Sequence, residues 1–234
     1  TIVENSFNIH QDGAKLVFRE EENPRAKLMA CARNDKLFSD GSDLRQLAKQ
    51  VRYVIGGTDE VAKTFRVIAL PKAWQTDPWS TVEENEHPDK WDDRLPILML
   101  PEEPEKLDQS LGRWLKDHLQ KRRNTIRFLL PRTGSTNAFL DRDLLVLARA
   151  ELKAHEWSGQ GPEYKKLHSE FQGARRENLK KRFDRFAVLS RWNFADPSQC
   201  RFSVETLKKQ GAQIPEAIEE ALLNDLFVPE DFAD

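Results

Sequence analysis

The chain has 234 residues, of which 38% are hydrophobic and 32% charged, and its formal net charge is −2. This length suffices for one large or two small domains with buried cores. The longest apolar runs are shorter than the roughly 20 residues that a membrane helix needs, and the amino terminus lacks the pattern of a signal peptide. We therefore expect a cytoplasmic protein that has no membrane partner.

The near-neutral net charge hides a strong segregation of charge along the chain. Residues 77–108 contain eleven acids and three bases, whereas residues 113–132 contain seven bases and one acid. Residues 163–191 are again basic, with nine bases against four acids. Such alternation fits either electrostatic pairing inside the fold or a basic surface that faces a polyanion, and both alternatives stay open at this point.

The first 57 residues predict a β-hairpin followed by two helices. Residues 6–19 alternate apolar and polar side chains around a Gly-containing turn. Asn23 followed by Pro24 is a typical helix start, and we expect a helix over 24–33. A second, amphipathic helix begins at Ser42 and ends at Gly56-Gly57.

Three apolar runs end on a Leu-Pro pair, and their prolines are thirty residues apart. Short, continuous apolar runs are typical of strands covered on both faces, and proline ends each run because it cannot donate a hydrogen bond to a neighbouring strand. The long connections between them favour parallel pairing. The runs are Phe65–Pro71, Leu95–Pro101 and Thr125–Pro131.

A loop of more than twenty residues, 72–94, separates the first two strands and carries three tryptophans among acids and prolines. Long loops inside compact domains are usually functional or disordered. Trp74, Trp79 and Trp91 are candidates for binding a partner protein. The alternative is that they pin the loop to the body of the protein.

The remaining periodic segments predict helices. Residues 105–122 form an amphipathic helix between the second and third strands, and residues 139–157 and 163–192 form a long antiparallel helical pair. We expect an α/β fold with a mostly parallel core sheet of three or more strands, an N-terminal segment of hairpin plus helices, and a long C-terminal helical pair. The expected segments are 1–57, 58–137, 138–195 and an acidic segment, 196–234, with a short helix over 215–225.

No complete catalytic motif accompanies this fold. The chain lacks a P-loop and a dinucleotide-binding fingerprint. The acids Glu102-Glu103 follow a strand, and Thr133 to Thr136 lie between a strand and a helix, but ordinary surface and capping roles explain both. The five histidines do not recur at ligand spacing, and Cys31 and Cys200 have no such neighbours, so we expect no metal site and reduced thiols. We assign no catalytic residue.

Basic side chains are the best remaining candidates for a binding surface. A face of this kind can contact several phosphates, and its binding weakens steeply with salt. The alternative is a solvated helix surface paired with acids. The nucleic-acid-binding candidates are Lys121, Arg122 and Arg123 before the third strand, and Arg175, Arg176, Lys180, Lys181, Arg182 and Arg185 on the expected long helix.

The order of these elements resembles the region that follows the ATPase core in large P-loop ATPases of bacterial and archaeal phage-defence islands, including the BREX-type ATPases. The resemblance covers roughly residues 16–192. Its most specific element is Arg123-Asn124-Thr125 leading into the strand Ile126 to Leu130, and Trp91-Asp92-Asp93-Arg94 before the second strand also contributes.

This resemblance implies that ATP is bound by a domain upstream of this segment, which itself needs no cofactor. The start at Thr1, directly before strand-like sequence, agrees with a fragment of a longer protein. The implied partners are the upstream ATPase domain, other proteins of the defence system and DNA.

Three functions are weighed. The first is a non-catalytic assembly and coupling module of a larger defence ATPase. The second is a nucleic-acid-binding module, in which residues 23–57 pack like a helix-turn-helix and the basic helix follows the phosphates. A small-molecule enzyme that uses the carboxyl ends of the strands is the third.

Overall fold

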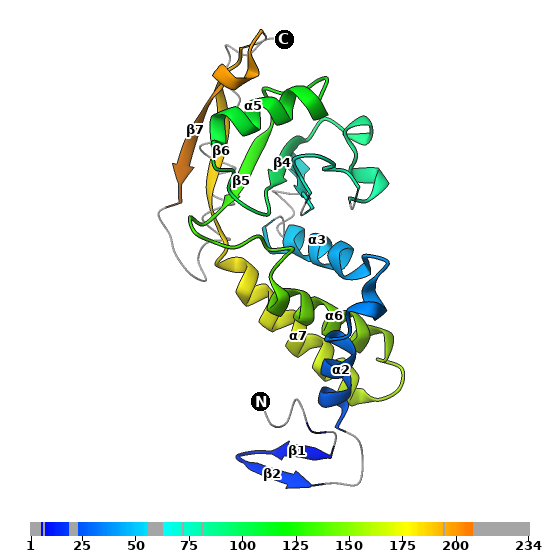
Figure 1. The fold of residues 1–234 in the computed structure, drawn as a ribbon. Helices are drawn as coiled ribbons and strands as arrows, with labels where there is room; N and C mark the ends of the chain where they lie inside the picture. Colours follow the sequence, from blue (N-terminus) through cyan, green and yellow to red (C-terminus); the bar gives the residue numbers. More distant parts are fainter. Residues whose placement is uncertain are drawn as a thin grey trace. The chain divides into compact units, whose positions relative to one another are not determined.

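The computed structural model describes residues 6, 8–18, 23–55, 63–71, 73–80, 82–193 and 195–207. The fold is α/β and contains two β-sheets (Figure 1). The chain divides into two compact units, each built from two separate stretches of sequence. The first unit draws on residues 1–47 and 141–176, and the second on residues 48–140 and 177–234. The four segments expected from the sequence stay a prediction.

The first unit begins with the predicted hairpin, in which β1 (Ile9–Asp12) pairs antiparallel with β2 (Lys15–Phe18). The predicted helix follows as α2 (Pro24–Ala32). The Asn23 side chain caps it by accepting hydrogen bonds from two backbone N–H groups of the first turn. Its Nδ2 also donates to the carbonyl of Ile9 at 2.6 Å, which ties the hairpin to the start of the helix.

Three helices build the core of the first unit: α2, α6 (Arg142–Glu156) and α7 (Pro162–Lys180) (Figure 1). The short 3₁₀ helix η1 (Asp35–Phe38) and the start of α3 (Ser42–Ile55) complete it. The buried side chains are aliphatic and aromatic at helical spacing, as an amphipathic pattern requires. They are Leu28, Met29, Ala32, Val146, Ala150, Ala154, Tyr164, Leu167 and Phe171.

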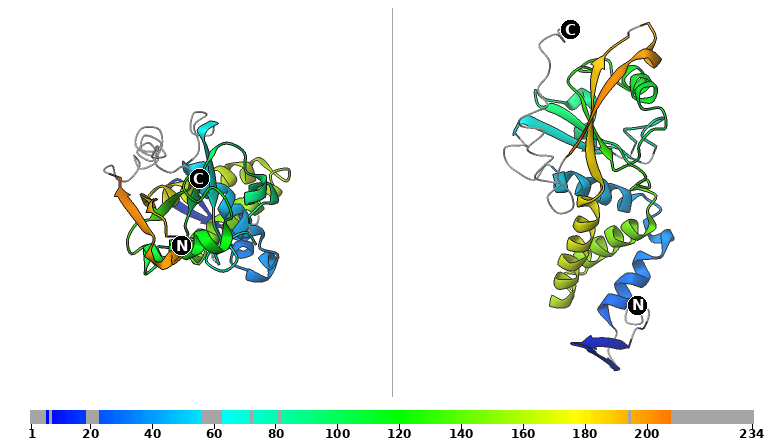
Figure 2. Two further views of the ribbon diagram at one scale, coloured as in Figure 1. Left: turned by 90° about the horizontal axis from the view of Figure 1, so that it is seen from above. Right: turned by 90° about the vertical axis from the view of Figure 1, so that its left-hand side faces the viewer.

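The second unit is built on a five-stranded sheet in the order β3-β4-β5-β6-β7. The first three strands are parallel, and β6 and β7 run antiparallel at one edge (Figure 2). The sheet is therefore mixed, and the expectation of a mostly parallel sheet is wrong in that respect. The strands are β3 (Phe65–Ala69), β4 (Leu95–Met99), β5 (Arg127–Pro131), β6 (Phe183–Arg191) and β7 (Arg201–Thr206).

The thirty-residue spacing of the Leu-Pro pairs is the register of the parallel strands. Phe65 lies opposite Leu95, and Ile97 lies opposite Arg127, so each residue faces the one thirty positions further along. The ladder continues to the leucines, because the N–H of Leu70 donates to the carbonyl of Met99 at 3.0 Å. It stops at the prolines, which have no N–H to donate.

Helix α5 (Leu107–His118) covers one face of this sheet and confirms the predicted helix between the second and third strands. Its Leu111, Trp114 and Leu115 pack in one buried cluster with Ile68, Leu98 and Phe128, which stand on the same face of three neighbouring strands. Complete burial of such a side chain contributes about 1.5–3 kcal/mol. The short helix η4 (Pro197–Gln199) packs against α5.

The predicted helix over 163–192 is wrong in its second half, and the long C-terminal helical pair is not present. Helix α7 ends at Lys180, and Phe183–Arg191 is the strand β6. Phe183, Phe186 and Leu189 continue the spacing of a helix. They also suit an interior strand, because β6 lies between β5 and β7 and buries Phe186 on one face and Ala187 and Leu189 on the other.

Among the residues that the structure describes, none of the helices combines the length and apolar character needed to cross a bilayer. The break predicted at Gly56-Gly57 and the acidic helix predicted over 215–225 lie outside the described residues.

Candidate nucleic-acid interface

A pocket with a volume of about 680 Å³ lies in the second unit, between the tryptophan-rich loop and the end of α5. The loop 72–94 leads into β4, and residues 119–126 lead into β5, so both segments lie at the amino ends of parallel strands. The lining residues are Trp79, His87, Pro88, Asp89, Trp91, His118, Leu119, Gln120, Lys121 and Arg122.

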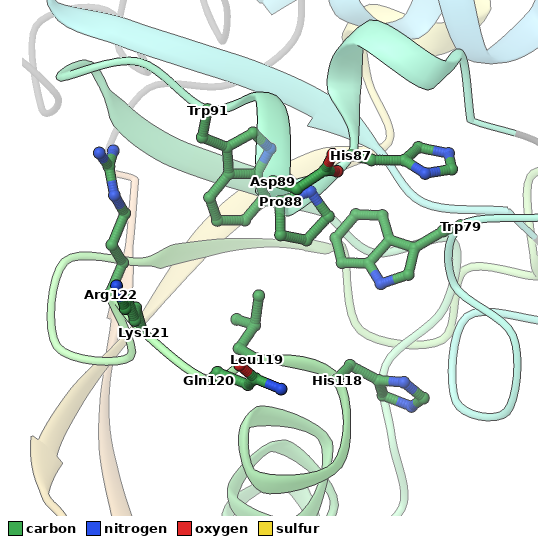
Figure 3. A pocket seen from close by; sticks show the side chains of 10 residues that line it. All are labelled: Trp79, His87, Pro88, Asp89, Trp91, His118, Leu119, Gln120, Lys121 and Arg122. Atoms are coloured by element: carbon green, nitrogen blue, oxygen red, sulfur yellow. The ribbon is translucent and has the colours of Figure 1, made fainter.

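The lining is aromatic along one side and basic at one end. Figure 3 shows Trp79, Pro88 and Trp91 on one side of the space, facing Leu119 and Gln120 on the other. The ring centroids of Trp79 and Trp91 are 6.0 Å apart, and the rings meet edge to face at 79°. Indole faces of this kind stack with planar ligands.

Backbone carbonyls hold the rings of the loop in place. Trp91 Nε1 donates to the carbonyl of Glu86 at 2.8 Å, across the short helices η2 (Glu84–Glu86) and η3 (Pro88–Lys90). A ring nitrogen of His118 lies 2.9 Å from the carbonyl of Gln75. These contacts bind the loop back onto itself and onto α5, so the pocket is formed before any ligand arrives.

The pocket is joined to the core through Trp114. Its ring lies 5.9 Å from Trp79 and 5.6 Å from the core residue Phe128. Its Nε1 donates to the carbonyl of Trp74 at 2.7 Å. Trp74 is completely buried in the core cluster, which matches the alternative that it pins the loop, and we no longer count it as a partner-binding residue.

Lys121 and Arg122 stand together at one end of the pocket (Figure 3). Lys121 is exposed and forms no ion pair within the described part of the chain. Arg122 donates to the carbonyl of Asp92, and its Nη2 lies 4.0 Å from Asp93. Its backbone has φ = 64°, in the left-handed region that non-glycine residues adopt only at a cost of about 1–3 kcal/mol.

The side chain of Asp92 organises the loop next to this basic end. It accepts hydrogen bonds from Arg94 Nη2 at 2.8 Å and from Arg66 Nη2 at 2.9 Å. These two guanidinium groups hold the pKa of the Asp92 carboxyl well below its usual range. One carboxylate thereby pairs with two arginines, which reduces but does not cancel their positive charge near the pocket.

Arg123 turns away from its two basic neighbours and has a structural role. Its Nε donates to the carbonyls of Leu115 and Leu119 at 3.2 and 2.9 Å, which satisfies orphan acceptors at the end of α5. Its guanidinium also lies 5.2 Å from the centre of the Trp192 ring. The segment Arg123-Asn124-Thr125 therefore builds the turn that starts β5.

The basic residues of α7 do not form one exposed face. Arg175 is completely buried, and its Nε donates to the buried carboxylate of Glu151 at 2.6 Å. Burial lowers the pKa of the Arg175 guanidinium. Arg176 is exposed on α7, and Lys181 is exposed beyond its end. The side chain of Lys180 is not among those that the structure describes.

Arg182 and Arg185 lie beyond the end of α7, so the expectation that they stand on one long basic helix with Arg175 is wrong. Arg182 Nε donates to the side chain of Asn178 at 3.0 Å, and its Nη1 donates to the carbonyl of Thr136 at 3.2 Å. Arg185 stands in β6 and holds Glu103 through two hydrogen bonds of 2.8 and 2.9 Å. This pairing lowers the pKa of the Glu103 carboxyl.

The carboxyl ends of the parallel strands are therefore occupied by internal pairs. Glu103 binds Arg185, and the neighbouring Glu102 accepts a hydrogen bond from Asn137 at 3.1 Å. Ligands of open α/β sheets usually bind at this edge. Here the pocket lies at the opposite, amino edge. No cluster of three or more potential metal ligands occurs among the described residues.

Four of the ten lining residues are predicted from the sequence as site residues. Trp79 and Trp91 are predicted to bind a partner protein, and Lys121 and Arg122 to bind nucleic acid, but the two pairs are not predicted to lie together. The signal was available, because Asp92 and Arg122 are thirty residues apart, which is the register of the strands that follow them.

Comparison with protein-family models, with curated proteins and with solved structures finds no match for this chain.

Proposed function

We propose that this chain is a non-catalytic coupling module that binds nucleic acid for a larger P-loop ATPase of the phage-defence type. The pocket is the observation that supports nucleic-acid binding. Two tryptophans predicted to bind a partner and two basic residues predicted to bind nucleic acid line one space of about 680 Å³. Indole rings stack on bases, and lysine and arginine pair with phosphates.

We assign nucleic-acid binding to the pocket instead of to the basic helix expected from the sequence. Arg175 and Arg185 are both engaged with carboxylates inside the protein, so a phosphate would have to displace those partners. Lys121, in contrast, is exposed beside an aromatic wall. Binding through one or two phosphate contacts and stacked bases suits a single strand better than a duplex, whose bases are already stacked.

The ATPase parentage rests on the resemblance alone. The two segments quoted for it, residues 91–94 and 123–125, precede the neighbouring parallel strands β4 and β5. The Arg-Asn-Thr segment forms the lead-in to β5, where Arg123 joins α5 to Trp192.

The test measures the binding of the 234-residue chain to a labelled single-stranded oligonucleotide and to a duplex of equal length, by fluorescence anisotropy at several salt concentrations. We expect the single strand to bind more tightly and its affinity to fall with salt, with a logarithmic slope of about −1 for one or two phosphate contacts. No binding at low salt refutes the nucleic-acid role. ATP hydrolysis by this chain alone refutes the non-catalytic assignment.

A further inference from the structure

We propose that the pocket is a binding site for one nucleotide unit, with the base against Trp79 and Trp91 and the phosphate at Lys121. This inference rests on the proposed function for its biological source, a single strand. The chemistry of the pocket is independent of that source, because a free mononucleotide carries the same base and phosphate.

The size and lining of the pocket fit this ligand class. Small-molecule sites have volumes of about 300–1,000 Å³ and combine apolar walls with few polar groups. Here Pro88 and two indole rings face Leu119 across a space of about 680 Å³ (Figure 3). Trp79 is half-buried, so part of its ring is open to a ligand.

The charges select an anionic ligand over a cationic one. Aromatic walls also bind quaternary ammonium groups, and Asp89 in the lining could serve such a cation. The carboxylate of Asp89, however, lies 3.3 Å from Lys90 Nζ and is already paired. Two bases, Lys121 and Arg122, and one acid, Asp89, line the pocket, and Lys121 forms no ion pair within the described part of the chain. The lining itself is therefore net positive, although the loop 72–94 around it is acidic.

The backbone at Arg122 holds Lys121 at the end of the pocket. Arg122 adopts φ = 64°, and its side chain is anchored to the carbonyl of Asp92. A strained conformation persists where its surroundings fix it, and such positions concentrate at functional sites. The anchor joins the turn before β5 to the loop before β4, which are the two walls of the pocket.

The experiment measures the affinity of the full chain for a fluorescein-labelled 15-residue oligothymidylate, with dTMP, thymidine and inorganic phosphate as competitors. Gln120 is exposed in the lining, so Gln120→Glu adds a negative charge at nearly unchanged shape without removing a core contact. We expect this variant to bind the labelled oligonucleotide about threefold to fivefold more weakly. Lys121→Ala should weaken the probe and reduce the logarithmic salt slope by about 0.7.

Two further variants separate the pocket from general effects. Trp79→Phe keeps an aromatic ring on the core and should weaken binding through poorer stacking, with an unchanged salt slope. Removal of a stacking ring weakens binding roughly 5- to 150-fold, so we expect this conservative change to weaken it about fivefold or less. Lys165→Ala removes an exposed lysine from α7 and should leave the affinity unchanged. Thermal unfolding of each variant checks that the fold is intact.

The outcomes distinguish this inference from the proposed function. If the oligonucleotide binds but Gln120→Glu and Lys121→Ala leave its affinity within twofold, the pocket is not the site and the proposed function stands. If dTMP binds with the expected variant sensitivities while the oligonucleotide does not, the pocket stands and the proposed function fails. Binding of choline or trimethyl-lysine that Gln120→Glu strengthens overturns the inference.

Discussion

The packing of α5 makes Gly112 the most informative position for a stability test. Gly112 is buried in the middle of α5, where alanine would favour the helix by about 1 kcal/mol. A Cβ at this position, however, would overlap the carbonyl oxygen of Pro197 and stand only 3.0 Å from Cys200 Cβ. Overpacking of a core costs about 1–3 kcal/mol.

The backbone of η4 cannot swing aside as a flexible side chain can, so we expect the upper end of that cost. The net effect of Gly112→Ala is then a loss of about 2 kcal/mol of unfolding free energy, or a fall in Tm of roughly 4–8 °C. Urea unfolding followed by tryptophan fluorescence measures the first quantity, and calorimetry measures the second.

The matched control is Gly173→Ala in α7. Gly173 is exposed, and a Cβ there would meet nothing within 4 Å. We expect this variant to gain about 0.5–1 kcal/mol, because only helix propensity and the entropy of the unfolded chain are at work. If Gly112→Ala gains as much as Gly173→Ala, the packing of α5 against η4 is not as described.

Three other outcomes follow from buried charges and thiols. Arg149→Met should cost about 3–5 kcal/mol in thermal unfolding, because it leaves the buried carboxylate of Asp43, now 2.7 Å from Arg149 Nε, without its partner. The pKa of Glu103 lies below its ordinary value of 4.5, so its pairing with Arg185 stabilises the fold above pH 4.5, and this stability is lost as the pH falls. Glu103→Gln should therefore lower Tm at pH 7 and make Tm fall less steeply in acid. An unchanged dependence of Tm on pH contradicts this. Burial raises the pKa of the Cys200 thiol, so a thiol reagent should modify the half-buried Cys31 first in the native protein, and equal rates would show that Cys200 is accessible.

Local sequence determined the elements whose signals need no distant partner. Asn23 before Pro24 starts α2, since a cap and a proline act within one turn. The Leu-Pro pairs mark the ends of three strands, and their spacing of thirty residues is the register of the parallel pairs. Asp92 and Arg122, which are in contact, have the same spacing of thirty residues, so this part of the pocket follows from the strand register.

Tertiary structure decided what local patterns leave ambiguous. The apolar residues of β6 fit a helix and a doubly buried strand equally well, and only pairing with β5 and β7 selects the strand. The environment of a charged residue is likewise decided by tertiary structure, because an arginine has the same place in the sequence whether it is solvated or bound to a carboxylate. Arg175 pairs with Glu151 and Arg185 pairs with Glu103 over long distances in the sequence, so neither arginine is free to form a binding surface. Tertiary structure also assembles the aromatic and basic pocket, because the folding of the loop onto α5 brings its two walls together.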